Sequence, residues 1–164
     1  MGVNEDYEGV KLMLRLYDLR REPQLRKARN WYLGNFHPAS SDEIQQRYPH
    51  GSEEETYIRM VLSYWNMVAS ILNRGLMDEA MFFENNGEMW VVWDRIRQLV
   101  PMWRSSQKDP TLFRNLEDAC RRYEGAREEK APGSTSVLHR MIVGTGSSEK
   151  KSQAEGLRLN SWLR

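Results

Sequence analysis

The chain has 164 residues, of which 40% are hydrophobic and 10% are aromatic, so it can build the core of one domain and is not disordered throughout. Its 24 lysine and arginine residues nearly balance 23 aspartate and glutamate residues, and the net charge of +1 argues against a protein that binds polyanions over its whole surface. The single cysteine, Cys120, excludes an internal disulfide and a cysteine-rich zinc site, and it is typical of a reducing, intracellular setting.

Targeting signals are not evident at the N-terminus. It lacks a basic segment followed by an apolar one, so we predict no signal peptide. Myristoylation at Gly2 is not expected, because Asp6 stands where Ser or Thr is required. The most apolar stretch, residues 57–72, contains several polar residues, whereas a membrane span needs about 20 mostly apolar ones. We therefore expect no membrane span and a cytoplasmic location.

The first third of the chain predicts two helices and an irregular segment. Residues 5–21 read as one helix with Asn4 as its cap, and Pro23 can open a second helix that runs to about residue 33. Residues 36–51 are interrupted by proline, serine and glycine, and we expect a short turn at 42–47.

The clearest predicted helix covers residues 53–74. Ser52 followed by Glu55 forms a capping box, which satisfies two backbone donors that would otherwise lack partners. Apolar side chains then recur with helical spacing at positions 57, 61, 64, 65, 68, 71 and 72. Gly75 suits the position after the last helical turn.

Three more helical pieces follow. Residues 77–84 predict a short linking helix, and a strong helix begins near residues 86–88, with a kink or an end at Pro101. Asp109 and Pro110 predict the start of another helix, with an apolar face that reaches Tyr123. Cys120 lies on that face and is interpreted as a small core residue.

These elements predict an all-α fold, namely a compact bundle of about five to six helices with a poorly ordered C-terminal tail. We assign residues 1–127 to the helical domain, because 16 of the 17 aromatic residues lie before residue 128. Residues 128–164 are rich in Ser, Gly and Lys and predict a flexible tail with short apolar islands at 137–143 and 157–163. The alternative is that either island docks on the domain or on a partner.

Catalytic and metal-binding motifs are not found in the sequence. It contains no phosphate-binding glycine loop and no nucleophile elbow. His37, His50 and His139 do not form a helical ligand pair, so we predict no metal site and no cofactor. An enzyme remains the less favoured interpretation.

An acidic stretch at residues 76–94 holds five carboxylates and no Lys or Arg, and Phe, Met and Trp side chains lie between the carboxylates. Aromatic walls around carboxylates could bind a cation, or the carboxylates could act as acid and base. Alternatively, the acids complement helix N-termini and the aromatic rings fill the core. The candidate pocket residues are Tyr64, Trp65, Glu84, Trp90 and Trp93.

A basic stretch at residues 11–30 holds seven cations against Asp18 and Glu22. With the aromatic residues that follow, it could contact nucleic acid or an anionic membrane surface. The alternative is a solvated face balanced by acidic segments at 42–55 and 78–94, or a charge-complementary self-association. The candidate interaction residues are Arg15, Arg20, Arg21, Arg26, Lys27 and Arg29.

Several short segments together carry a family resemblance over residues 14–123. They are RKARNW at 26–31, VLSYWNMVA at 61–69, RGLMD at 74–78, Trp93 with VPMWR at 100–104, and FRNLE at 113–117. The chain resembles a bacterial family of small all-helical domains of unknown function, whose members often follow N-terminal membrane helices that this sequence lacks. The resemblance implies an all-α fold and supplies no catalytic residues.

Our leading hypothesis is a non-enzymatic helical interaction module. It would bind a protein partner or a second copy of itself, as in a homodimer, through helix faces rich in Trp, Met and Arg. The alternatives are binding of nucleic acid or an anionic surface through residues 11–30, and a small-ligand pocket or enzyme lined by Trp and carboxylate side chains.

Overall fold

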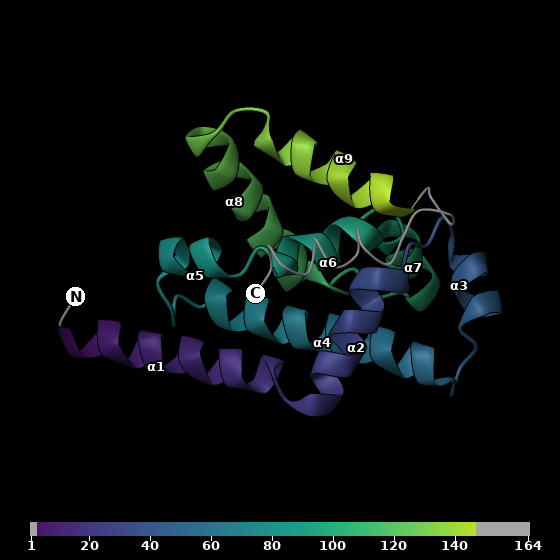
Figure 1. Cartoon of the computed structure of the whole chain (residues 1–164), viewed down its shortest axis with the longest axis horizontal. Coiled ribbons are helices and arrows are strands. Elements are labelled where there is room, and N and C mark those ends of the chain that lie inside the picture. The colour runs from purple at the N-terminus through teal and green to yellow at the C-terminus, as the bar shows by residue number, and fades with distance from the viewer. Residues whose placement is uncertain (1–2, 147–164) are drawn as a thin grey trace.

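The computed structural model describes residues 3–146, with side chains for residues 7–144, and every regular element in this range is an α-helix (Figure 1). The helices are α1 (Val3–Arg20), α2 (Pro23–Asn35), α3 (Ser41–Arg47), α4 (Glu53–Asn73), α5 (Glu79–Asn85), α6 (Glu88–Ile96), α7 (Val100–Gln107), α8 (Arg114–Lys130) and α9 (Ser134–Gly146). The predicted all-α fold is confirmed, although nine helices in the described range exceed the predicted five to six. No helix in that range combines the length and apolar character that crossing a bilayer requires.

Helix α4 begins and ends as its capping residues predict. The Ser52 hydroxyl accepts a hydrogen bond from the Glu55 backbone N–H at 3.1 Å. The Glu55 carboxylate accepts instead from the Gly51 N–H at 3.4 Å, because the Ser52 N–H donates to the Pro49 carbonyl at 3.0 Å. Gly75 follows the helix with a φ of +70°, a conformation that glycine adopts without a steric cost.

Helix α4 also lies at the centre of the fold, where it packs against α2, α6 and α8. Helix α1 lies alongside it at the lower edge of Figure 1, and the Tyr64 hydroxyl of α4 donates to the Leu16 carbonyl of α1 at 2.6 Å. Near the start of α1, a Cβ atom at Gly9 would come within 3.3 Å of the Leu76 carbonyl oxygen. The absence of a side chain there lets α1 approach the turn between α4 and α5.

Two helix boundaries differ from the sequence prediction. The helix predicted to kink or end at Pro101 already ends at Ile96 as α6. Pro101 lies instead in the first turn of α7, where its missing N–H costs nothing. Asp109 caps a separate turn by accepting from the Thr111 N–H at 2.8 Å. Helix α8 therefore begins four residues later than Pro110, at Arg114.

Residues 128–146 differ from the flexible tail that we predicted from residue 128. Helix α8 continues to Lys130, and α9 turns back from it after Gly133, whose φ is +83°. The Glu128 carboxylate holds this turn by accepting the backbone N–H groups of Gly133 and Thr135 at 2.7 and 2.9 Å. The rest of the predicted tail, residues 147–164 with the apolar island at 157–163, lies outside the described residues.

Helix α9 is ordered because one of its faces reaches the core. Ile142 is 1% exposed and belongs to the main hydrophobic cluster, and Leu138, one turn earlier, packs against that cluster. Nδ1 of His139 lies 2.7 Å from a carboxylate oxygen of Asp94 on α6. The spacing of residues 138 and 142 is that of one helix face. The apolar island at 137–143 therefore docks on the domain, which is the alternative to a flexible tail that the sequence left open.

We predict that Ile142→Ala lowers the free energy of unfolding by about 2–4 kcal/mol, because it removes buried apolar atoms and leaves a cavity between α9 and the core. Urea denaturation of the full chain measures the change. The control is Val143→Ala at a neighbouring exposed position, which should change stability by about 0.5 kcal/mol or less. Equal stability of both variants and the wild type would mean that α9 does not dock.

Candidate functional site

A buried carboxylate, Glu88, organises the interior at the first turn of α6. Its side chain is 0% exposed. Arg29 of α2 binds it through two N–H groups, with Nε 2.6 Å from Oε1 and Nη2 paired with Oε2. The indole N–H of Trp65 on α4 donates to Oε1 at 3.2 Å. This bidentate, charge-assisted pair joins α2, α4 and α6 at one point.

Arg20, at the end of α1, lies next to this pair. Arg29 donates its remaining Nη1 to the Arg20 carbonyl at 3.0 Å, which fixes the end of α1 against α2. The Arg20 guanidinium lies over the rings of Tyr17 and Trp65, at 5.1 and 5.8 Å from the ring centroids. Burial lowers the pKa of Arg20 from its ordinary value, and the charge of Glu88 opposes that change.

Hydrogen bonding leaves Arg20 with spare donors. Its only side-chain hydrogen bond to another described residue runs from Nη1 to the Asn86 side-chain oxygen and is 3.4 Å long. No described carboxylate lies within 4 Å of its guanidinium, although the residue is only 5% exposed. A guanidinium has five N–H groups, so most of its donors are available to a ligand.

A cavity of about 800 Å³ adjoins Arg20. It lies between the end of α1, the α5–α6 segment and the α8–α9 hairpin, whose arrangement Figure 1 shows. Its lining residues are Tyr17, Arg20, Phe83, Glu84, Asn85, Gly87, Glu88, Val91, Tyr123, Ala126, Arg127, Lys130, Ala131, Ser134 and Leu138. The volume falls within the range of about 300–1,000 Å³ that is typical of small-molecule sites.

Some charged side chains that line the cavity have no oppositely charged partner among the described residues. Glu88 is already bound by Arg29, and Glu84 lies 3.9 Å from Lys130. Arg127 reaches only the Tyr123 hydroxyl, at 3.5 Å, and its Nε is buried with no hydrogen-bond partner in the described part of the chain. The hydroxyl oxygen of Ser134 is buried in the same unpartnered state. Within residues 7–144, Arg20 and Arg127 therefore line the cavity without a carboxylate of their own.

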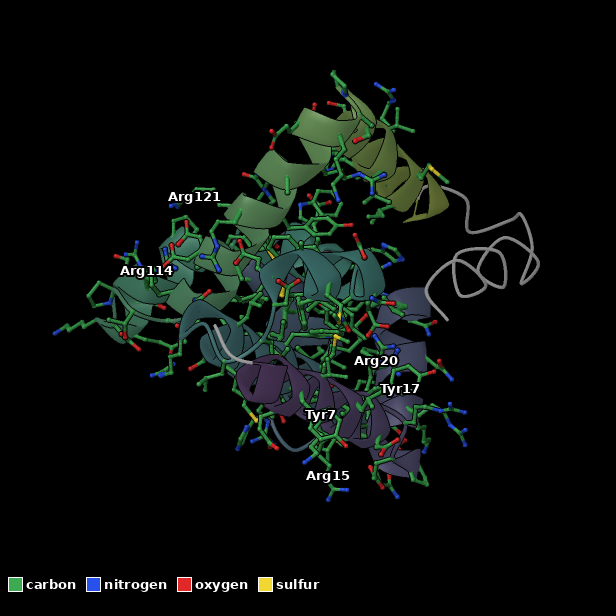
Figure 2. All side chains as sticks on the ribbon, turned by 90° about the vertical axis from the view of Figure 1, so that its left-hand side faces the viewer. Tyr7, Arg15, Tyr17, Arg20, Arg114 and Arg121 are labelled. Carbon is green, nitrogen blue, oxygen red and sulfur yellow. The ribbon has the colours of Figure 1, made fainter. Side chains whose placement is uncertain are left out.

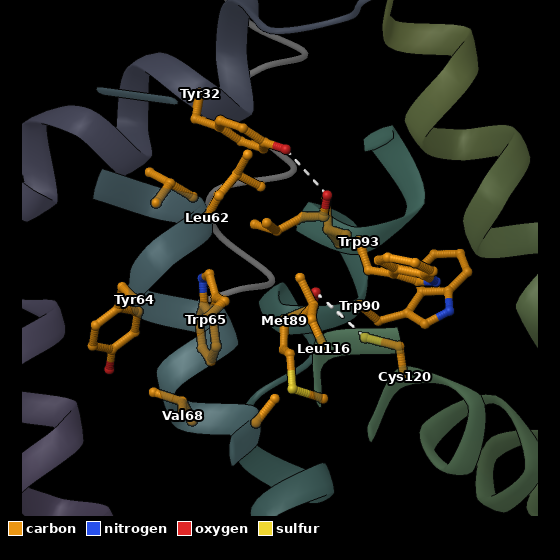
Figure 3. Close-up of a cluster of buried hydrophobic side chains, with 14 of the residues drawn as sticks. Tyr32, Leu62, Tyr64, Trp65, Val68, Met89, Trp90, Trp93, Leu116 and Cys120 are labelled. Carbon is orange, nitrogen blue, oxygen red and sulfur yellow. Dashed lines mark hydrogen bonds between the residues drawn. The ribbon is translucent and has the colours of Figure 1, made fainter. Parts of the chain in front are cut away.

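Three of the predicted pocket residues are tryptophans, and the structure places them in the core (Figure 3). Trp65 and Trp90 are 1% and 0% exposed, and the Trp90 indole donates to Glu124 at 2.8 Å. Trp93 is also buried. Tyr64 is bound to the α1 backbone, and burial raises its pKa to about 12. Of the five predicted residues only Glu84 lines the cavity.

The predicted basic face is also divided by the fold. Arg15, Arg21, Arg26 and Lys27 are exposed, whereas Arg20 is buried and Arg29 is partly buried. Figure 2 shows Arg15 at the edge of the molecule and Arg20 further in, beside Tyr17. Lys27 is engaged by Glu53 at 2.6 Å. The six cations thus do not form one continuous surface.

The cavity residues that sequence reasoning missed include a group at the end of α8 and on α9. Tyr123 was assigned to the core face, and Arg127, Lys130, Ser134 and Leu138 fell at or beyond the predicted domain boundary. The predicted boundary after residue 127 follows the aromatic content and lies within α8, so it separates most of α8 from α9, which packs against it. The apolar pair at 138 and 142 was the available signal.

The three histidines have separate surroundings. His139 contacts Asp94, and His50 lies 3.9 Å from Glu55. Burial lowers the pKa of His37 to about 4. Among the described residues, no three His, Cys, Asp or Glu side chains gather as metal ligands would.

Cys120 is a buried core residue, as predicted. Burial raises the pKa of its thiol well above the ordinary value, so the reactive thiolate is disfavoured. The described lining of the cavity contains no histidine or cysteine, and its hydroxyl groups come from Tyr17, Tyr123 and Ser134. The arrangement supplies charge, hydrogen-bond donors and apolar walls, which are the elements of a binding site.

Comparison with known proteins identifies the family of the domain. The family model described as "Domain of unknown function (DUF4760)" matches residues 7–123, which include α2 through α7, most of α1 and the first part of α8. Neither the curated proteins nor the solved structures contain a significant match.

We predict that Glu88→Gln lowers the free energy of unfolding by about 3 kcal/mol or more, because it removes the charge that compensates the Arg29 guanidinium in the interior. Urea denaturation near neutral pH measures the loss. The matched control is Glu79→Gln, which removes a surface ion pair with Arg122 and should cost less than about 1 kcal/mol. Similar losses for the two variants would contradict the central role of Glu88.

Proposed function

The chain belongs to the family described as a domain of unknown function (DUF4760), and we propose that this domain is a binding protein for a small anionic ligand held in the cavity beside Arg20. One observation carries the proposal. Arg20 and Arg127 both line the cavity, and neither guanidinium has a carboxylate within 4 Å among the described residues.

Electrostatics supports an anion rather than a cation. The two carboxylates of the lining are engaged, Glu88 by Arg29 and Glu84 more loosely by Lys130. A partly buried guanidinium without a counter-charge is unfavourable, and an anion would relieve that cost at Arg20 and Arg127 together. The guanidinium fork also matches the oxygens of a carboxylate or phosphate.

The size and walls of the site support a small molecule. A cavity of about 800 Å³ holds a compound of moderate size, and Val91, Leu138 and Phe83 supply apolar surface for a part that is not charged. This function is a form of the small-ligand alternative predicted from the sequence, at a different set of residues. The cytoplasmic location and bacterial origin expected from the sequence remain parts of the proposal.

We predict that at least one of inorganic phosphate, hexyl phosphate and phenyl phosphate binds the full chain, and that Arg127→Gln weakens this binding by about tenfold or more, because a charge-assisted hydrogen bond is lost. Isothermal titration calorimetry at constant ionic strength measures the affinities.

The control variant for this experiment is Arg121→Gln. Arg121 is an exposed arginine of the same helix, and Figure 2 shows it far from Arg20. Its replacement should leave the affinity unchanged. The proposal is wrong if none of the three phosphates binds, or if Arg127→Gln binds them as the wild type does.

A second candidate is the self-association that the sequence favoured, and one observation supports it. Helix α9 carries three exposed apolar side chains, Val137, Met141 and Val143, of which Val137 and Met141 are four residues apart and share one face. A second copy that covered them would remove apolar surface from water.

For this second candidate we predict a concentration-dependent dimer in light scattering, which Met141→Glu abolishes by placing a charge in the contact. The control Gln107→Glu adds the same charge at an exposed position on α7 and should leave the dimer intact. A wild-type chain that stays monomeric at high concentration would exclude this candidate.

A further inference from the structure

The walls of the cavity carry three aromatic rings from three separate helices: Tyr17 of α1, Phe83 of α5 and Tyr123 of α8. Phe83 and Tyr123 meet edge to face, with centroids 5.4 Å apart and an interplanar angle of 86°. Two rings at this angle present one ring face and one ring edge to a third ring. Aromatic pairs prefer edge-to-face contacts of this kind.

The unpaired cations lie next to these rings. The Arg20 guanidinium is 5.1 Å from the centroid of the Tyr17 ring, and Arg127 contacts the Tyr123 hydroxyl at 3.5 Å. A ligand that contacts either ring therefore lies close to a guanidinium. One compact molecule can thus contact a guanidinium and an aromatic ring of the lining at the same time.

The fold also keeps this space open. Gly87 lines the cavity, and a Cβ atom at this position would lie 3.1 Å from the Tyr123 hydroxyl oxygen. A side chain at this position would displace the Tyr123 ring or occupy the space in front of it. Even a methyl group at position 87 would require the Tyr123 hydroxyl to shift by a few tenths of an ångström.

We propose that the ligand is an aromatic ring bearing a carboxylate or phosphate group, with the anion between Arg20 and Arg127 and the ring against Phe83, Tyr123 and Tyr17. This inference rests on the proposed function and narrows it. Aliphatic anions share the charge but gain no edge-to-face contact, so they should bind more weakly.

The test compares three phosphates in calorimetric titrations of the full chain. Phenyl phosphate has the ring and the anion, hexyl phosphate has the anion on a flexible chain, and inorganic phosphate has the anion alone. We expect phenyl phosphate to bind at least about fivefold more tightly than either of the others. Saturation-transfer NMR should show its ring protons close to aromatic protons of the protein.

Variants of the aromatic lining residues test which rings contact the ligand. Phe83→Leu keeps an apolar side chain and should weaken phenyl phosphate by about two- to tenfold, with hexyl phosphate unchanged. The matched control is Phe113→Leu, since Phe113 is also partly buried and contacts one aromatic ring, that of Trp103, away from the cavity lining. Tyr17→Leu, at a residue that is 40% exposed, tests the same wall without disturbing the core.

The outcomes separate the inference from the function on which it rests. If phenyl phosphate binds no more tightly than hexyl phosphate, or no more tightly than inorganic phosphate, the aromatic ligand is overturned while the anion site remains. Equal weakening of both organic phosphates by Phe83→Leu and Tyr17→Leu would also overturn it. If no phosphate binds, the proposed function fails and the inference fails with it.

Discussion

The burial of one carboxylate, Glu88, is the constraint on which the other helices depend. A charge in the interior is tolerated only when it is paired and hydrogen-bonded, so Arg29 of α2 and Trp65 of α4 must both reach the first turn of α6. Arg29 in turn binds the last carbonyl of α1, at Arg20. Four helices are thereby fixed relative to one another by a few directional bonds, around which the apolar side chains pack.

The position of α6 explains why tryptophans that could line a pocket instead fill the core. All nine residues of α6 are buried, since α4 and α8 pack against it and α9 reaches it through His139 and Asp94. Figure 3 shows Trp65, Trp90 and Trp93 within this interior, and the hydrogen bond from the Tyr32 hydroxyl to the Val92 carbonyl joins α2 to the same helix. The indole N–H of Trp90 meets Glu124, so this ring can be buried without an unpaired donor.

The cavity is a consequence of the same arrangement. Glu88 is satisfied by Arg29, which leaves Arg20 buried beside it without a carboxylate of its own in the part of the chain that the structure describes. The α8–α9 hairpin then adds Arg127 to the lining and supplies Leu138 as apolar surface. Arg29 belongs to the interior network because it is paired with Glu88. Arg20 and Arg127 belong to the candidate ligand site because neither is paired with a carboxylate among the described residues.

Local sequence determined the helical class and the best-defined helix. The capping pair Ser52 and Glu55, the apolar spacing of α4 and the turn at Gly75 act within a few residues, so they are readable without the fold. Tertiary structure alone decided which arginines turn inward and that Arg127 and Tyr123 share a cavity with Arg20. The physical reason is that pairing of a buried charge depends on groups far apart in sequence: 59 residues separate Arg29 from Glu88, and no local pattern records which partner a side chain will meet.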